Sequence, residues 1–111
     1  MSGISLRFPR SRRLETRDFA AVLHKGKALR GRGLSVLLKT NVVPSPRFGV
    51  VVPKRIAQRS VDRNRLKRIL REWFRHNSER LAGRDCVVRL TAPQTDEDAL
   101  IAEIERLLKG R

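Results

Sequence analysis

The 111-residue sequence contains a single cysteine, Cys86, and this scarcity excludes two kinds of structure. One cysteine cannot form an internal disulfide, and it cannot build a metal cluster of cysteine ligands. Cys86 lies in the apolar run CVVRL, so we expect it to be a small buried residue of the core. We therefore assign no cysteine chemistry to this chain.

Aromatic residues are also scarce, because the chain has one Trp, four Phe and no Tyr. A protein that binds single-stranded nucleic acid by broad base stacking needs several exposed rings. We therefore expect at most one or two stacking contacts beside a surface that binds phosphates.

Long apolar runs are missing as well. No run approaches the roughly 20 residues of a membrane-spanning helix, and the first residues, MSGISLRFPRSRR, lack the apolar core of a signal peptide. We expect a cytoplasmic protein with no membrane partner. Its length suits a single core, so residues 1–111 are expected to form one domain, with residues 1–13 as a basic, mobile arm.

Acidic residues are few, at 11 Asp and Glu against 26 Lys and Arg, which gives a net charge of +15. Residues 1–93 hold 23 of the basic residues but only six of the acidic ones, so the positive charge is concentrated there. A charge of this size favours nucleic acid as the partner.

The sequence offers no convincing catalytic or metal-binding group of residues. The acidic cluster Asp96, Glu97 and Asp98 occupies the first turn of an expected helix, where it interacts favourably with the helix dipole. His24 and His76 lie in basic surroundings, which suits solvent or RNA contacts better than proton transfer. We predict that the protein binds its partner and contributes no catalytic residue and no metal site.

Apolar periodicity and turn residues predict an α+β fold. The Pro-containing segment NVVPSP is expected to be a loop, and Gly26 is expected to end the first helix in a left-handed conformation. Helices packed on an apolar sheet face give a compact sandwich. The expected elements are a helix ending at Gly26, strands at 34–39 and 47–52, a helix started by Ser60 or Asp62, a strand at 86–90 and a helix opening at 95–98.

Residues 61–75, VDRNRLKRILREWFR, predict an amphipathic helix with an unusual polar side. The apolar residues fall on one face, as expected for a helix that packs on a sheet. Residues 63–75 contain six basic residues and one acid, Glu72, so pairing within the helix cannot neutralise the charge. A face that is only solvated would mix its signs, so we predict that this one binds nucleic acid. The apolar residues are Leu66, Ile69, Leu70, Trp73 and Phe74.

Three blocks of the chain resemble the conserved segments of one known family. Arg63, Asn64 and Arg65, continuing as LKRILRE, resemble the RNR signature of the bacterial ribonuclease P protein subunit. FGVVVPKR at 48–55 resembles its strand that ends in a basic pair, and RLETRDFAAVLHKG at 13–26 resembles its first helix. The order and spacing of the blocks agree with the family too.

The resemblance implies a more complete fold than periodicity predicts. It implies a four-stranded sheet in the element order α-β-β-β-α-β-α, with the additional short strand near residues 27–30. It also implies a left-handed β-α-β crossover that carries the RNR helix, whereas about 98% of such connections between parallel strands are right-handed.

The resemblance also implies a function. The protein would assist a catalytic RNA, which binds most of the magnesium, in removing the 5′ leader from precursor tRNA. For Phe19, the sequence alone favours ordinary core packing over leader contact. The implied contacts to the catalytic RNA are Arg63, Asn64, Arg65, Lys67, Arg68 and Arg71, and those to the leader are Phe19, Lys54, Arg55 and Arg89.

Two other functions remain open at this point. A ribosomal or other structural RNA-binding protein would have a similar size and charge. A DNA-binding module would place the basic helix in a major groove, although this helix has few side chains suited to base edges.

Overall fold

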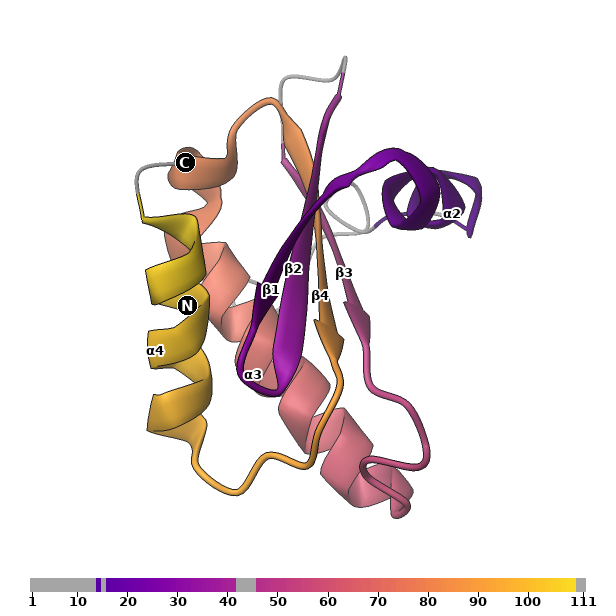
Figure 1. Ribbon diagram of the computed structural model, residues 1–111, viewed down its shortest axis with the longest axis vertical. Helices are drawn as coiled ribbons and strands as arrows, with labels where there is room; N and C mark the ends of the chain where they lie inside the picture. The colour runs from indigo at the N-terminus through magenta and orange to yellow at the C-terminus, as the bar shows by residue number, and fades with distance from the viewer. Residues whose placement is uncertain (1–13, 15, 42–45, 110–111) are drawn as a thin grey trace, which may run out of the picture.

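The computed structural model describes residues 14, 16–41 and 46–109, and these confirm the expected order of helices and strands (Figure 1). The short strand expected near residues 27–30 is present. The arm expected at residues 1–13, and residues 42–45 of the expected loop, lie outside the described residues. The elements are α2 (Thr16–Lys25), β1 (Lys27–Gly31), β2 (Leu34–Thr40), β3 (Arg47–Val51), α3 (Ser60–Asn77), the 3₁₀ helix η2 (Ser78–Leu81), β4 (Arg84–Leu90) and α4 (Glu97–Leu108).

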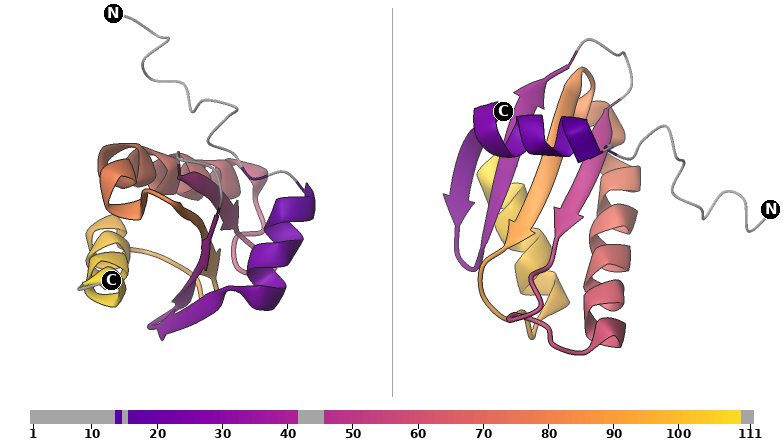
Figure 2. Two further views of the ribbon diagram at one scale, coloured as in Figure 1. Left: turned by 90° about the horizontal axis from the view of Figure 1, so that it is seen from above. Right: turned by 90° about the vertical axis from the view of Figure 1, so that its right-hand side faces the viewer.

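The four strands of the described chain form one mixed sheet in the order β1-β2-β4-β3. The pairs β1–β2 and β2–β4 are antiparallel, whereas β3 and β4 are parallel. Parallel neighbours need a crossover, and α3 supplies it along the face opposite α2 (Figure 2). With both strands running in one direction, this connection is left-handed, as the family resemblance implies.

The main core lies between the sheet and the pair α3 and α4 (Figures 1 and 2). Side chains alternate along each strand, so Leu34, Val36 and Leu38 of β2 enter this core together. Phe48 of β3 stacks on Phe74 of α3 with ring centroids 4.6 Å apart. Cys86 of β4 is buried in the same core, as expected, and burial raises the pKa of its thiol to about 12.

Helix α3 packs through the predicted apolar stripe. Leu66, Leu70, Trp73 and Phe74 are buried, while Ile69 is half-buried at the margin. The helix begins at Ser60, and the capping position before it is occupied by Arg59, which makes no capping hydrogen bond through its side chain. The helix therefore depends on its packing rather than on a capping side chain.

Helix α4 begins where the acidic cluster predicts. The carboxylate of Asp96 accepts hydrogen bonds from the backbone N–H groups of Asp98 and Ala99, at 2.9 and 3.2 Å. The indole N–H of Trp73 donates to Glu105 of α4 at 2.9 Å, which ties α4 to α3 beside the core. The apolar side of α4 packs into the main core, with Leu100, Ile104, Leu107 and Leu108 buried and Ile101 partly buried.

Helix α2 covers the opposite face of the sheet (Figure 2). Val22 is buried there with Leu37 of β2 and Val87 of β4, and Phe19 packs against this second cluster. The left-handed conformation expected at Gly26 is wrong, since among the described residues only Gly33 and Gly83 have a positive φ. Gly26 is required for space instead, because a Cβ there would collide with the carbonyl oxygen of Val22.

No helix in the described part of the chain is both long enough and apolar enough to cross a membrane.

The described elements pack in three layers: α2 forms the first, the sheet the second, and α3 with α4 the third (Figure 2).

Candidate nucleic-acid interface

The outward side of α3 carries all six residues that were predicted to contact a catalytic RNA. None belongs to the buried stripe of the helix, so the packing of α3 brings their side chains onto one side of the protein. Asn64, Arg65 and Arg68 are exposed, and Arg63, Lys67 and Arg71 are half-buried.

Arg63 is engaged with the segment that precedes the helix. Its Nη1 donates to the carbonyl oxygens of Ala57 and Gln58, at 2.9 and 2.8 Å. These bonds pair two backbone acceptors that lie before the first turn of α3. The guanidinium therefore holds the 57–58 segment against the helix, and this contact favours a positioning role for Arg63 over a phosphate contact.

Arg65 forms an ion pair with Glu97 at the start of α4. Both side chains are about half exposed, at 50% and 47%, so water screens the pair and its contribution to stability is small. A phosphate group could therefore replace Glu97 at little expense in folding energy.

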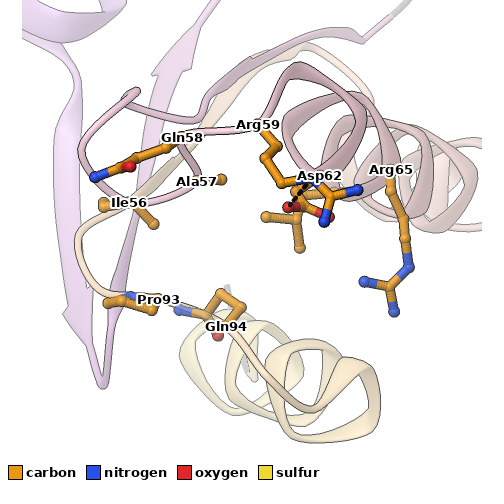
Figure 3. A pocket seen from close by; sticks show the side chains of 9 residues that line it. Ile56, Ala57, Gln58, Arg59, Asp62, Arg65, Pro93 and Gln94 are labelled. Carbon is orange, nitrogen blue, oxygen red and sulfur yellow. Dashed lines mark ion pairs between the residues drawn. The ribbon is translucent and has the colours of Figure 1, made fainter.

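A cavity of about 320 Å³ lies beside this ion pair. Figure 3 shows it between the segment Ile56–Arg59, the first turns of α3 and the loop at Pro93 and Gln94. Arg59 and Asp62 face each other across its rim at 3.8 Å. The cavity thus has one charged wall, formed by Arg59, Asp62 and Arg65, and one wall of neutral loop residues.

Lys67 and Arg68 have no hydrogen-bond or ion-pair partner among the residues that the structure describes. Further along the helix, Glu72 pairs with Arg75, which lowers the pKa of Glu72. Because Glu72 is engaged with Arg75, it does not neutralise Lys67 and Arg68, and their positive charges remain available to a polyanion.

A second candidate surface lies on the other side of the sheet, at α2. Phe19 is partly buried, and its ring rests on Gly49 of β3, where any Cβ would collide with the ring edge. Phe19 also lines a shallow cavity of about 340 Å³ with Leu14, Ala20 and Leu23. The side chain therefore combines the packing that the sequence favours with an open edge that a ligand can reach.

Arg89 shares this face, and the basic pair lies beside it. Val87 points toward α2, so Arg89, two residues further along β4, points the same way and is exposed. The register places Arg89 opposite Val51, the last residue of β3. Lys54 and Arg55 follow that strand end and are both exposed, in the segment that leads to α3. This segment therefore connects the two candidate surfaces.

One polar group near α2 was missed by the sequence analysis. Arg47 of β3 bridges Asp85 of β4 and Asp18 of α2, and Asp85 is 2% exposed. The hydrogen bonds to Asp85, with the charges of both acids, raise the pKa of Arg47. A charged residue inside the apolar strand RDCVVRL was the available signal, because a buried carboxylate requires a partner.

The acidic side chains do not gather into a metal site in the described part of the chain. No group of three or more His, Cys, Asp or Glu lies close enough together to hold a metal ion there. Asp96 is occupied as a helix cap and Glu97 as the partner of Arg65. What the surface offers is positive charge with a few apolar edges.

Comparisons with known proteins agree on one family. The model of the family described as Ribonuclease P matches residues 8–110. The ribonuclease P protein component of Pseudomonas aeruginosa is 46% identical over 88 residues, which cover 77% of this chain and 64% of that protein. The chain thus spans less than two thirds of this relative. The corresponding protein of an Azoarcus species is 41% identical over 96 residues, covering 86% of this chain and 80% of the relative. The RNase P protein structure from Thermotoga maritima is 31% identical, with a TM-score of 0.73 over 87% of this chain and 94% of that one.

Proposed function

The chain belongs to the ribonuclease P family, and on this premise we propose that it is the protein subunit of a ribonucleoprotein that removes the 5′ leader from precursor tRNA. In this proposal the RNA subunit carries the catalytic centre, and the protein binds both that RNA and the substrate. The reaction is the hydrolysis of one phosphodiester bond, which leaves the mature 5′ end of the tRNA. We expect the protein and this reaction to be located in the cytoplasm.

The observation that supports the proposal best is the row of cations on the outward side of α3, a helix whose apolar side is buried against the sheet. Four apolar side chains fix the helix on the sheet, so its outward cations keep a constant spacing. Lys67 and Arg68 have no partner within the described residues, and Arg65 has one that water already weakens. Guanidinium groups present a fork of N–H donors that suits phosphate oxygens. We assign this face to the catalytic RNA.

We assign the leader to the surface at α2. The ring of Phe19 can stack on one base, while Arg89, Lys54 and Arg55 are exposed cations that can bind the phosphates around it. The family resemblance indicates aromatic residues where this chain has Leu23 and Leu37. Leu37 is buried beneath α2, whereas Leu23 is 37% exposed and adds apolar surface beside Phe19. Leader binding here therefore depends on one ring and on charge.

Magnesium is assigned mainly to the RNA subunit and the substrate. Most of the described acids cap a helix or form ion pairs, and no three of them lie close enough together to hold a metal ion, so no step is assigned to a magnesium ion on the protein. The contribution of the protein is electrostatic: its cations reduce the repulsion between the phosphates of the RNA subunit and those of the substrate. Less magnesium is then needed for the same substrate affinity.

The direct test is to incubate precursor tRNA with the protein alone, with the RNA subunit alone, and with both, at low magnesium. We expect cleavage only when both are present. At high magnesium the RNA alone should also cleave, since metal ions then replace the screening that the protein provides. Cleavage by the protein alone would overturn the proposal.

The leader surface is tested separately with Phe19→Leu, which removes the ring but keeps most of the apolar volume. Loss of one stacking contact should weaken binding of precursor tRNA by about 1 to 3 kcal/mol. Binding of mature tRNA, which has no leader, should stay unchanged. Equal weakening of both substrates, with a lower melting temperature, would instead identify Phe19 as a purely structural residue.

A further inference from the structure

Helix α2 is attached to the sheet by a small apolar contact. It has ten residues, and among its described side chains only Val22 is fully buried. The second cluster around Val22 is far smaller than the main core beneath α3 and α4. A helix this short is held in place by its tertiary contacts, so each polar contact at its ends matters for its position.

Arg47 provides such a contact by joining three elements. Its Nε and Nη2 donate to the two carboxylate oxygens of Asp85 on β4, at 3.0 and 2.9 Å. Its Nη1 donates to Asp18 on α2 at 2.9 Å. Asp85 also accepts from Asn41 at 2.7 Å, so this buried carboxylate is well paired and holds the guanidinium in one orientation.

The ion pair is adjacent to the ring that is assigned to the leader. Asp18 precedes Phe19 in the first turn of α2, and the ring of Phe19 rests on Gly49. Gly49 lies two residues after Arg47, so both face α2 from the same side of β3. The helix is therefore held on β3 at two neighbouring points, and a shift of Asp18 must move the ring.

We propose that Arg47 and Asp18 are a positioning pair for the leader of precursor tRNA, which hold α2 so that the ring of Phe19 meets the first bases of the leader. This inference rests on the leader site proposed above. Neither residue is a direct ligand: two acids already occupy the guanidinium of Arg47, and the carboxylate of Asp18 repels phosphate.

The sign of the effect distinguishes positioning from simple electrostatics. Removing the negative charge of Asp18 makes the protein more positive, which by itself would tighten binding of any RNA. Loss of a positioning contact would weaken binding of the leader alone. The two explanations therefore predict opposite changes for one variant.

The test uses the reconstituted holoenzyme and Asp18→Ala, because changing Arg47 would leave the buried carboxylate of Asp85 without its cationic partner. The matched control is Asp98→Ala, which removes one exposed acid from the first turn of α4 and changes the net charge equally. We expect Asp18→Ala to weaken binding of precursor tRNA by about three- to tenfold, without weakening mature tRNA or assembly with the RNA subunit. The control should bind both substrates at least as tightly as the wild type.

Combination with Phe19→Leu separates the inference from the function on which it rests. If Asp18 acts through the ring, the double variant should bind precursor tRNA no more weakly than Phe19→Leu alone. Additive losses, or an Asp18→Ala variant that binds precursor tRNA as tightly as the control does, would overturn the positioning pair while leaving the leader site intact. A Phe19→Leu variant with normal leader binding would instead remove the leader site, and the inference with it.

Folding is controlled by the melting temperature and by Asp18→Asn, which keeps the shape and one acceptor oxygen. We expect Asp18→Asn to show a smaller loss in the same direction. Equal loss for leader-containing and leaderless substrates in both variants would indicate general damage to the fold and would refute the proposal.

Discussion

Arg68 offers the cleanest test of the basic face of α3. It is exposed, and within the described residues it has no hydrogen-bond or ion-pair partner, so Arg68→Ala leaves neither an unpaired acid nor a cavity. Stability should therefore change by less than about 0.5 kcal/mol. A lost charge-assisted contact at an exposed site should weaken assembly with the RNA subunit by about 1 to 1.4 kcal/mol, roughly five- to tenfold at low salt.

The dependence of this binding on salt concentration gives a second quantity that can be compared between the variant and the wild type. Each phosphate contact releases counterions, so the slope of log affinity against log salt should become shallower by about 0.7 to 0.9 in the variant. A fourfold rise in salt, from about 50 to about 200 mM, should then reduce the difference between variant and wild type by about threefold. The assay is a titration of labelled RNA subunit with protein at several salt concentrations.

Lys109→Ala is the matched control, because Lys109 is an exposed cation at the end of α4, beside β1. It changes the net charge equally but lies outside the predicted interface. Identical slopes for wild type and Arg68→Ala would mean that the face of α3 is merely solvated. Equal flattening by both variants would attribute the effect to net charge rather than to a contact.

Three further predictions concern single groups. Hydrogen bonds from Arg106 and from the backbone N–H of Arg32 lower the pKa of Glu103 to about 2. Its stabilising contribution is therefore present above the unfolded pKa of about 4.3 and is lost as pH falls toward 2, so urea titrations should show Glu103→Gln less stable than wild type at pH 7 but equal near pH 2. Burial of Cys86 should slow its alkylation at pH 8 by roughly a thousandfold relative to denatured protein, and fast labelling of the native protein would contradict this. Phe74→Ala should lower the free energy of unfolding in urea by about 3 to 5 kcal/mol, because it deletes a ring that is 1% exposed and stacked on Phe48.

The elements with strong local signals were predictable from the sequence. Helix α3 combines a 3.6-residue apolar period with cations on its other side, and both features are properties of a single segment. Strand β1 was different, because KALRG buries only Leu29 and has no clear alternation. It exists because β2 offers a partner edge, so only the family resemblance indicated it.

The candidate site was predictable as a set of residue types but not as a set of contacts. The sequence indicates that Arg63, Arg65 and Arg68 share a basic helix, yet it treats them as equivalent. In the structure Arg63 holds backbone carbonyls, Arg65 pairs with Glu97, and Arg68 has no partner within the described residues. These differences depend on what the folded chain places opposite each side chain.

Local periodicity and net charge are both readable along the chain. They determined the amphipathic helix α3, the packing of its apolar side on the sheet, and the preference for a polyanion as partner. Tertiary structure alone decided which cations are engaged and formed the bridge from Arg47 to Asp85 and Asp18, whereas the left-handed crossover was indicated by the family resemblance and by no local pattern. Arg47 is 38 residues from Asp85 and 29 from Asp18 in the sequence. No local pattern relates such distant residues; they meet because β3 pairs with β4 and because α2 lies across both strands.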